Sequence, residues 1–376
     1  MNDTRPNLAL LSTLRANGEL DLTLAESPMP SLKQDDEIIV QMLAAPINPS
    51  DMGVMLGPVD PATAKLVETD GGSATRLQGP PAAAAALGAR LDKAMPVGNE
   101  GAGRVISAGS EAQGLIGRLV AIRGGGMYVR YRKVRAADAL VLPDDATPAQ
   151  GAAAFINPMT ALGMIETMRL EGFTALVHTA AASNLGQMLC RLCRAEGVGL
   201  VNIVRSPQQA ALLRGIGAEH VCDSSAPGFM DDLETALRAT GATLAFDAIG
   251  GGPLAGQILS AMEKACTDPD ANYSHYGSGI PKKVYIYGGL NTGPTEFRRS
   301  FGMAWSMGGW LLFPILQRVG PERAAQLKQR VAAELKTTFA SAYGQTISLE
   351  QAVEPEVLKA YARRETGGKY LIDLSR

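Results

Sequence analysis

The sequence predicts an α/β protein made of a compact, barrel-like β domain and a doubly wound domain built on a parallel sheet. With 376 residues the chain is long enough for two domains. Up to about residue 155 it consists of short β-branched runs separated by glycine and proline. From about residue 157 short apolar runs alternate with helical stretches, a pattern typical of parallel strands joined by helices.

Composition narrows the class of protein. The chain is 46% hydrophobic and 19% charged, with a formal net charge of −2. This balance gives no electrostatic reason to expect a nucleic acid or an anionic membrane as a partner. The first twenty residues lack the long apolar core of a signal peptide, and four irregularly spaced cysteines do not form a disulfide framework. We therefore expect a cytoplasmic protein.

The first domain should contain strands in "DEIIVQMLAAPINPSD", "GAGRVISAG", "GRLVAIRGG" and "MYVRYRKV", closing into a small barrel. Residues 56–96 interrupt this series and are rich in proline, glycine and alanine. We interpret them as an inserted loop with one short helix from about Ala82. A connection of this length is unusual unless it has a function, such as that of a lid.

In the second domain, the runs "TALVHTA", "LVNIVR", "EHVCD", "LAFDAIG" and "KVYIYGG" are the expected parallel strands. After Pro321 come a long helical segment and a last strand, "GKYLIDL", which we expect to return to the first domain. The predicted division is therefore 1–155 with 319–376 for the β domain, and 156–318 for the α/β domain.

The turn "HTAAASNLGQ" (residues 178–187) connects a predicted strand to an amphipathic helix and is the candidate dinucleotide-binding turn. The helix would present free N–H groups and its positive dipole end to an anion. Gly186 allows close contact between helix and strand, and the alanines leave the backbone nearly as approachable as glycine. The expected cofactor-binding residues here are Thr179, Ala180, Ala181, Ser183, Asn184, Leu185 and Gly186.

Arg205 indicates which cofactor this turn serves. It follows Gly186 by nineteen residues, where an NAD-specific site would carry an acidic residue for the ribose 2′-hydroxyl. An arginine at that place suits a 2′-phosphate, so the sequence favours NADPH. The next helix has Ser206 as N-cap, Pro207 at its first position and Gln209 completing a capping box.

The sequence predicts no metal site. Cys190 and Cys193 share the apolar face of one helix, which indicates buried structural cysteines, and the three histidines are scattered. Alcohol oxidation normally uses zinc as a Lewis acid. Addition of hydride to a conjugated C=C–C=O group or a quinone needs only hydrogen-bond donors for the developing oxyanion. The sequence therefore favours reduction of an activated alkene or a quinone.

Several motifs occur in a familiar order: "AAPINPSD", "GNEGAGRVISAGS", "FINPMTA", "VHTAAASNLGQ", "VRSPQQAALLRGIGAEHV" and "YGGL". Together they resemble the medium-chain dehydrogenase/reductase superfamily, most closely its zinc-free quinone oxidoreductases and 2-enoyl thioester reductases. The resemblance implies a GroES-like catalytic domain and a Rossmann cofactor domain with a cleft between them. Where zinc alcohol dehydrogenases have a cysteine and a histidine ligand, this chain has Asn48 and Asn99, so no catalytic zinc is implied.

The resemblance also implies roles for single residues. Asn48 and Asp51, the candidate catalytic residues, would line the cleft near the nicotinamide. The remaining residues that the resemblance places at the cofactor are Thr160, Tyr287, Gly288, Gly289 and Lys369.

In one respect the chain departs from the family. The proton-donating tyrosine of mitochondrial-type enoyl reductases would fall at about Val59, where the predicted insertion begins. The donor is therefore missing or comes from elsewhere; Tyr128, Tyr273, Tyr276 and Tyr285 are open candidates.

Three functions remain possible. The favoured one is an NADPH-dependent reductase of quinones or α,β-unsaturated carbonyls. An enoyl thioester reductase is the alternative, with Arg298 and Arg299 as a basic pair for carrier phosphates. The third is a non-catalytic NADPH-binding sensor or scaffold, consistent with the missing tyrosine.

The uncharged segment 300–317 bears on assembly. It is roughly long enough to span a bilayer, but glycines, serines and one proline interrupt it, so we expect no membrane span. Within it, "GGWLLFP" (residues 308–314) resembles the Rossmann edge strand that pairs across a two-fold axis in this family. Because an apolar edge needs covering, we expect a homodimer.

Overall fold

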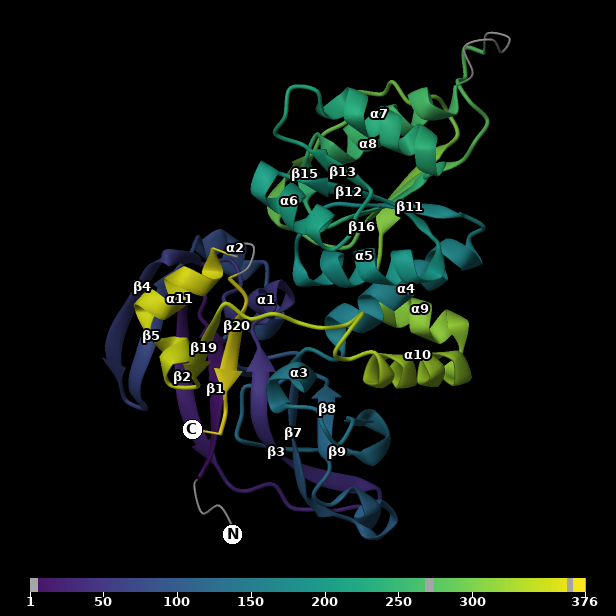
Figure 1. Ribbon diagram of the computed structural model, residues 1–376. Coiled ribbons are helices and arrows are strands. Elements are labelled where there is room, and N and C mark those ends of the chain that lie inside the picture. The colour runs from purple at the N-terminus through teal and green to yellow at the C-terminus, as the bar shows by residue number, and fades with distance from the viewer. Residues whose placement is uncertain (1–5, 268–273, 364–367, 376) are drawn as a thin grey trace. The chain divides into compact units, whose positions relative to one another are not determined.

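The computed structural model describes residues 6–267, 274–363 and 368–375 (Figure 1). The chain divides into two compact units, Met1–Ile156 with Lys328–Arg376, and Asn157–Leu327. The chain passes from the first unit to the second at the start of α4 (Ile156–Leu170). It returns to the first unit inside α10 (Pro321–Ala333). The two units are described separately below.

The first unit contains two sheets. The smaller one is antiparallel and has the order β4-β5-β2-β1-β6. Its strands are β1 (Asn7–Leu14), β2 (Glu19–Ser27), β4 (Asp60–Thr69), β5 (Gly72–Gln78) and β6 (Ala94–Pro96).

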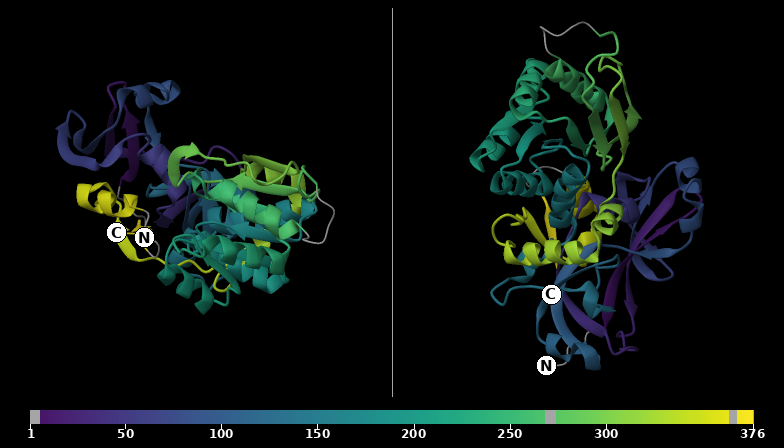
Figure 2. Two further views of the ribbon diagram at one scale, coloured as in Figure 1. Left: turned by 90° about the horizontal axis from the view of Figure 1, so that it is seen from above. Right: turned by 90° about the vertical axis from the view of Figure 1, so that its right-hand side faces the viewer.

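The larger sheet has the order β10-β8-β7-β3-β20-β19, with β9 also paired to β3. Its last strands come from the far end of the chain: Leu371 pairs with Pro46, so β20 lies against β3 (Figure 2). Leucine, isoleucine, valine and methionine side chains from both sheets form one core. The strands are β3 (Glu37–Pro46), β7 (Glu100–Ala108), β8 (Leu119–Arg123), β9 (Tyr131–Arg135), β10 (Leu140–Val141), β19 (Gln345–Ser348) and β20 (Tyr370–Asp373).

Short helical elements connect these strands. The α-helices of the first unit, apart from the ends of α4 and α10, are α1 (Met52–Met55), α2 (Pro81–Ala85), α3 (Pro148–Ala152) and α11 (Pro355–Ala362). The 3-10 helices are η1 (Pro49–Asp51), η2 (Gly88–Arg90), η3 (Ser110–Leu115), η4 (Ala136–Asp138) and η5 (Gln351–Val353).

The prediction of an inserted loop at residues 56–96 was wrong. This stretch forms the hairpin of β4 and β5, which extends the smaller sheet, and then α2, η2 and β6. The hairpin was missed because its strands carry mainly threonine, alanine and charged residues, with few large apolar side chains to mark a buried face. The short helix expected from about Ala82 is confirmed as α2, which begins at Pro81.

The second unit is a six-stranded parallel sheet in the order β13-β12-β11-β14-β16-β18. The strand order reverses between β11 and β14, and in such sheets ligands bind outside the carboxyl ends of the strands at this reversal. The strands are β11 (Ala175–His178), β12 (Gly199–Val204), β13 (His220–Asp223), β14 (Leu244–Asp247), β16 (Lys282–Ile286) and β18 (Trp305–Gly309).

Helices cover both faces of this sheet. In Figure 1, α7 and α8 lie on the upper face, and α4 and α5 lie on the lower one. Two short strands form a separate parallel pair. They are β15 (Gly250–Gly252), which follows β14, and β17 (Asn291–Thr295), which follows β16. The helices are α5 (Asn184–Glu196), α6 (Pro207–Gly215), α7 (Phe229–Thr240), α8 (Leu254–Cys266) and α9 (Leu312–Val319).

The predicted edge strand was displaced along the chain. The edge strand is β18, and most of the apolar run after it forms α9, so residues 308–314 span the end of a strand and the start of a helix. Trp310 is 6% exposed, because its ring packs over Gly163 of α4. None of the helices in the described residues is both long and apolar enough to cross a membrane.

Candidate active site

The conformation of the turn between β11 and α5 is fixed by Ala180, Ser183 and a single glycine, Gly186. Ala180 has a φ of +50°, in the left-handed region that costs an L-residue about 1–2 kcal/mol. A Cβ atom at Gly186 would lie 2.1 Å from the carbonyl oxygen of Ala181, so only glycine fits there. Ser183 caps α5, because its hydroxyl accepts a hydrogen bond from the Gly186 N–H at 3.2 Å. Strain persisting at a turn is a feature of functional sites.

The backbone donors of this turn fall into two groups. The N–H groups of Ala181 and Ser183 donate within the turn region, to the carbonyls of Ile203 (3.1 Å) and Ala180 (3.0 Å). Those of Ala182 and Leu185 have no acceptor among the residues that the structure describes. They lie at the positive end of α5, so they are the donors left for an anion. The sequence predicted Ala181 and not Ala182 as a cofactor-binding residue, because the hydrogen bond from the Ala181 N–H to Ile203 on the neighbouring strand was not predictable.

Thr179 joins the two strands at the reversal of the sheet. Its hydroxyl donates to Oδ1 of Asp247 at 2.7 Å and accepts from the Ala248 N–H at 2.8 Å. The same carboxylate accepts from the N–H groups of Ile249 (2.9 Å) and Gly250 (3.1 Å). The Thr179 hydroxyl therefore holds the ends of β11 and β14 together.

Arg205 directly follows β12 and is exposed. Within the described part of the chain its guanidinium has no acidic partner. Ser206 is the N-cap of α6, since its hydroxyl accepts from the Gln209 N–H at 3.3 Å. The Gln209 side chain reaches the N–H of Arg205 (3.0 Å), one residue before the N–H that a standard capping box uses. This bond orders the backbone that carries the arginine.

An imidazole and a phenol meet at the same edge of the sheet. Nε2 of His178, the last residue of β11, lies 2.7 Å from the hydroxyl of Tyr287, which follows β16. Burial lowers the pKa of His178 to about 3, so the ring is neutral at physiological pH. Tyr287 was expected beside the nicotinamide, but its pairing with His178 was missed because 109 residues separate them. The parallel pairing of β11, β14 and β16 is the signal that could have found it.

The other residues expected near the nicotinamide lie in the second unit as well. A Cβ atom at Gly288 would lie 2.7 Å from the Ala248 carbonyl oxygen, so the chain passes close to the end of β14 there. Gly289 is exposed, and Thr160 is 8% exposed in α4.

In the first unit, Asp51 is the centre of a buried polar cluster. Its carboxyl group accepts hydrogen bonds from the N–H groups of Asn48 (2.7 Å) and Asn99 (2.9 Å) and lies 2.8 Å from the Tyr128 hydroxyl. Burial raises the pKa of Asp51 to about 6. The hydroxyl of Tyr128 also lies 2.9 Å from the carbonyl of Pro46. Asp51 is therefore a buried organiser of this turn, with only 1% of its surface exposed.

Glu100 and Lys369 complete the cluster. Glu100 accepts from Asn48 Nδ2 (2.9 Å) and from the N–H groups of Phe155 (2.9 Å) and Ile156 (2.8 Å). The Lys369 ammonium is buried, lies 5.6 Å from the ring centre of Tyr343 and has no hydrogen-bond acceptor among the described residues. Burial lowers the pKa of Lys369, and the charges of Glu100 and Asp51 oppose that shift. Sequence reasoning missed Glu100, although it stands directly after Asn99 in the "GNE" motif.

The candidate tyrosines differ in the state of their hydroxyl groups. That of Tyr128 is buried in the Asp51 cluster, and that of Tyr285 donates to Glu171 at 2.6 Å. Tyr276 is 61% exposed and its ring lies against His275. Tyr273 lies outside the described residues.

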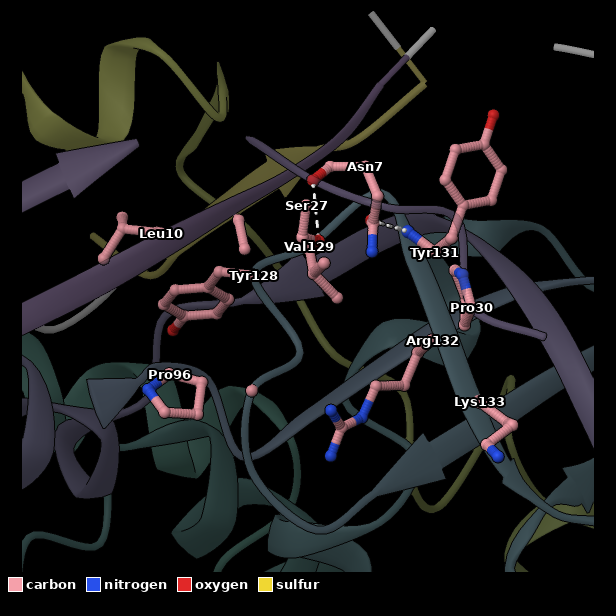
Figure 3. Close-up of a pocket in the computed structure, with 12 residues that line it drawn as sticks. Asn7, Leu10, Ser27, Pro30, Pro96, Tyr128, Val129, Tyr131, Arg132 and Lys133 are labelled. Atoms are coloured by element: carbon pink, nitrogen blue, oxygen red, sulfur yellow. Dashed lines mark hydrogen bonds between the residues drawn. The ribbon is translucent and has the colours of Figure 1, made fainter. Parts of the chain in front are cut away.

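A hollow of about 330 Å³ lies beside the cluster in the first unit (Figure 3). Tyr128 forms part of its wall, while the hydroxyl of that residue reaches Asp51. Arg132 points into the hollow from β9, and its Nε has no partner in the described ranges. Asn48, Asp51 and Lys369 do not line it, so the hollow is distinct from the predicted site residues.

The cysteines lie in the core. Cys190 and Cys193 are each 1% exposed on α5, and burial raises the pKa of both thiols. Across residues 6–267, 274–363 and 368–375, no three histidine, cysteine, aspartate or glutamate side chains are grouped so as to hold a metal ion.

Known proteins resemble the chain in sequence and in fold. A quinone oxidoreductase of Pseudomonas aeruginosa is 33% identical over 133 residues, which cover 34% of this chain and 41% of that protein. The mitochondrial enoyl-[acyl-carrier-protein] reductase of Caenorhabditis elegans is 30% identical over 258 residues, 65% of each chain. The chain is therefore similar in sequence to parts of a quinone oxidoreductase and an enoyl-[acyl-carrier-protein] reductase, the two kinds of protein that its motifs resemble. Its alignments span less than two thirds of either relative.

A solved structure has the same fold over nearly the whole length of the chain. A Mesorhizobium loti protein with the provisional name NADPH:quinone reductase superposes with a TM-score of 0.72, covering 99% of this chain and 100% of its own. The two are 24% identical, so the likeness concerns the fold. The predicted α/β fold, with a GroES-like and a Rossmann domain, is confirmed. No protein-family model matches the chain.

Proposed function

We propose that the protein is an NADPH-dependent reductase that transfers hydride to a quinone or an α,β-unsaturated carbonyl compound. The observation that carries this proposal is the β11–α5 turn followed by Arg205. A strained Ala180, a glycine that admits no Cβ and two unpartnered N–H groups lie at a helix N-terminus, and an arginine without an acidic partner in the described residues follows the next strand. The motif resemblance and the names of the similar proteins support it.

The residues fit a dinucleotide phosphate. We assign the pyrophosphate to the N–H groups of Ala182 and Leu185, with Ser183, Asn184 and Gly186 shaping the turn. Arg205 would bind the 2′-phosphate through its planar fork of donors. In the first unit, the Lys369 ammonium has no hydrogen-bond acceptor among the described residues, and it suits an anionic or carbonyl group of a ligand. Thr160, Tyr287, Gly288 and Gly289 keep their proposed places near the nicotinamide.

Bound NADPH supplies the hydride, and the chain supplies position and electrostatics. A helix N-terminus and Arg205 hold the phosphates, which lets the rest of the site orient the acceptor and exclude water. The same arrangement requires no residue to form a covalent bond with the acceptor.

Replacing Arg205 with alanine tests the cofactor assignment. Loss of a charge-assisted pair predicts a roughly 10- to 100-fold rise in the Kd for NADPH, with the Kd for NADH changed less than about threefold. Fluorescence titration of the reduced cofactors measures both constants. Arg214→Ala, which removes an exposed arginine within α6, is the matched control and should leave both constants unchanged. Equal weakening of NADPH and NADH by Arg205→Ala contradicts the 2′-phosphate assignment.

An enoyl thioester reductase is the second candidate function. Arg298 and Arg299 are exposed beyond β17 and have no acidic partner within the described ranges, so they suit the phosphates of a thioester carrier. Comparing crotonyl-CoA with a crotonyl thioester of a phosphate-free thiol discriminates between the two. A preference for the CoA substrate that disappears in Arg298→Ala/Arg299→Ala favours this candidate. Cofactor binding without turnover of any acceptor would instead favour a sensor or scaffold.

We also propose that the protein assembles as a homodimer. The strand β18 ends the six-stranded sheet, and large apolar side chains near it are exposed, notably Met303 (68%) and Leu311 (69%). An open, apolar sheet edge is normally covered by a partner. Sedimentation at micromolar concentration should give twice the 39.4 kDa chain mass, and a monomer contradicts the proposal.

A further inference from the structure

The sheet of the second unit places a neutral histidine and a tyrosine together where a ligand is expected. His178 ends β11, one of the two strands at the reversal, and Tyr287 follows β16, two strands away. Their rings stack with centroids 5.7 Å apart, and Nε2 lies 2.7 Å from the phenol oxygen. Tyr287 also packs edge-on to Trp310, which limits its rotation. The phenol is thus held in one position at the carboxyl edge of the sheet.

The unpartnered nitrogen of His178 indicates which group donates the hydrogen bond. Nδ1 is buried and has no partner in the described part of the chain. A buried N–H without an acceptor is rarer in proteins than an acceptor without a donor, so Nδ1 carries the lone pair and Nε2 carries the hydrogen. The Nε2–H group then donates to the Tyr287 oxygen. The hydroxyl hydrogen of Tyr287 has no acceptor among the described residues, and the residue as a whole is partly exposed.

We propose that Tyr287 is the proton donor of the reduction and that His178 is its positioning residue. This inference rests on the proposed function. The acceptor gains a hydride from the reduced nicotinamide at its β-carbon, and the electron pair of the C=C bond becomes that of an enolate. The α-carbon then takes the proton of the Tyr287 O–H bond, whose electron pair stays on the phenolate oxygen. His178 Nε2–H stabilises that phenolate until water returns a proton to it.

The other described tyrosines considered earlier are less suited to this step. The Tyr128 hydroxyl is enclosed by Asp51 and the Pro46 carbonyl, and the Tyr285 hydroxyl is bound to Glu171. Glu171 precedes β11, so Tyr285 is held toward the opposite edge of the sheet. The ring of Tyr287 is fixed by packing against His178 and Trp310, and its hydroxyl hydrogen has no acceptor among the described residues.

Tyr287→Phe tests the proposal with two kinds of acceptor. Protonation of carbon is slow without a positioned acid, so kcat with an enone should fall at least about 100-fold. A quinone is protonated on oxygen, where water serves, so its kcat should fall by a much smaller factor than the enone kcat. The Kd of NADPH, measured by fluorescence in the same variant, shows how much of any loss comes from cofactor binding. Tyr285→Phe is the matched control and should leave both acceptors unaffected.

The outcomes separate this inference from the function on which it rests. If the wild-type protein reduces the enone and Tyr287→Phe reduces it equally well, the proton-donor role is wrong and the proposed function stands. An equal loss with both acceptors, together with weaker NADPH binding, would mean that Tyr287 holds the cofactor instead. If the wild-type protein reduces neither acceptor, both proposals fail.

His178 can be examined without cofactor or turnover. The chain has three histidines, so 15N NMR of labelled protein should resolve their tautomers. We expect His178 to carry hydrogen on Nε2 alone, with that signal shifted in Tyr287→Phe. Hydrogen on Nδ1 would overturn the positioning role. In turnover, His178→Gln, which retains a donor, should restore more of the enone kcat than His178→Phe, with KM unchanged in both; equal losses would contradict the role.

Discussion

The turn after β11 and the cluster around Asp51 both concentrate polar groups, but they use them differently. At the turn, the N–H groups of Ala182 and Leu185 have no acceptor, and the Arg205 guanidinium no acidic partner, in the described residues. The backbone itself is strained at Ala180. Around Asp51, nearly every donor meets an acceptor from the chain, and Lys369 is the principal exception. The β11–α5 turn is suited to bind a ligand. The Asp51 cluster holds its own turn in place and leaves only the Lys369 ammonium available to a ligand.

Gly186→Ala should have the largest effect on the turn, in both stability and cofactor binding. A methyl group there would overlap the Ala181 carbonyl, a backbone atom that cannot move aside cheaply. We expect a loss of at least about 3 kcal/mol in the free energy of unfolding. NADPH binding should be lost as well, because the helix must withdraw from the turn. Urea denaturation and cofactor titration measure the two effects.

Gly215→Ala is the control for Gly186→Ala, since a Cβ atom at the end of α6 meets nothing within 4 Å. It should stabilise the protein by up to about 1 kcal/mol. A fully stable Gly186→Ala protein would show that the close approach is not required.

The Asp51 cluster should respond to pH. The folded-state pKa of about 6 exceeds the ordinary value of 3.8, so the folded protein binds this proton more tightly than the unfolded chain. The contribution of Asp51 to stability is complete below about pH 4 and is lost as the pH rises through 6. The linkage amounts to about 2 kcal/mol between pH 4.5 and pH 7.

Asp51→Asn removes that proton equilibrium. The difference in unfolding free energy between wild type and Asp51→Asn should therefore shrink by about 2 kcal/mol from pH 4.5 to pH 7, measured by urea denaturation. The comparison cancels the contribution of Glu100, whose pKa burial also raises. A difference that does not vary with pH would mean that Asp51 is already ionised at pH 4.5.

Ala180→Gly should have the smallest effect and would sharpen the comparison. Glycine adopts a positive φ without the Cβ penalty, but it also increases the entropy of the unfolded chain. We expect a net gain of about 0.5 kcal/mol, with unchanged NADPH affinity, from thermal unfolding and titration. Ala182→Gly, where φ is not positive, should instead cost about 0.5–1 kcal/mol. Destabilisation by Ala180→Gly would contradict strain at this position.

Local sequence signals predicted the helix-forming side of the site. Gly186 and Ser206 have the close-contact and cap roles that the sequence predicted, because these depend on neighbours within five positions. Ser183, predicted as a cofactor-binding residue, is also the N-cap of α5. The left-handed Ala180 was not predictable, since alanine has no preference for that conformation.

Long-range pairings account for the rest. Tyr128 lies 77 residues from Asp51, and Tyr287 lies 109 residues from His178. Each pair meets only because of the fold of its own unit. The β4–β5 hairpin was missed for a different reason, because its strands have few large apolar side chains and so little hydrophobic contrast between their two faces.

The position of β20 in the sheet determines which unit can complete its fold first during synthesis. This strand lies between β3 and β19, so the larger sheet of the first unit joins residues near the start of the chain to Tyr370–Asp373. The second unit is one uninterrupted stretch and can fold while synthesis continues. Until β20 has left the ribosome, β3 keeps an open, apolar edge on the side that β20 will cover, and this is the interval in which a nascent chain most needs a chaperone.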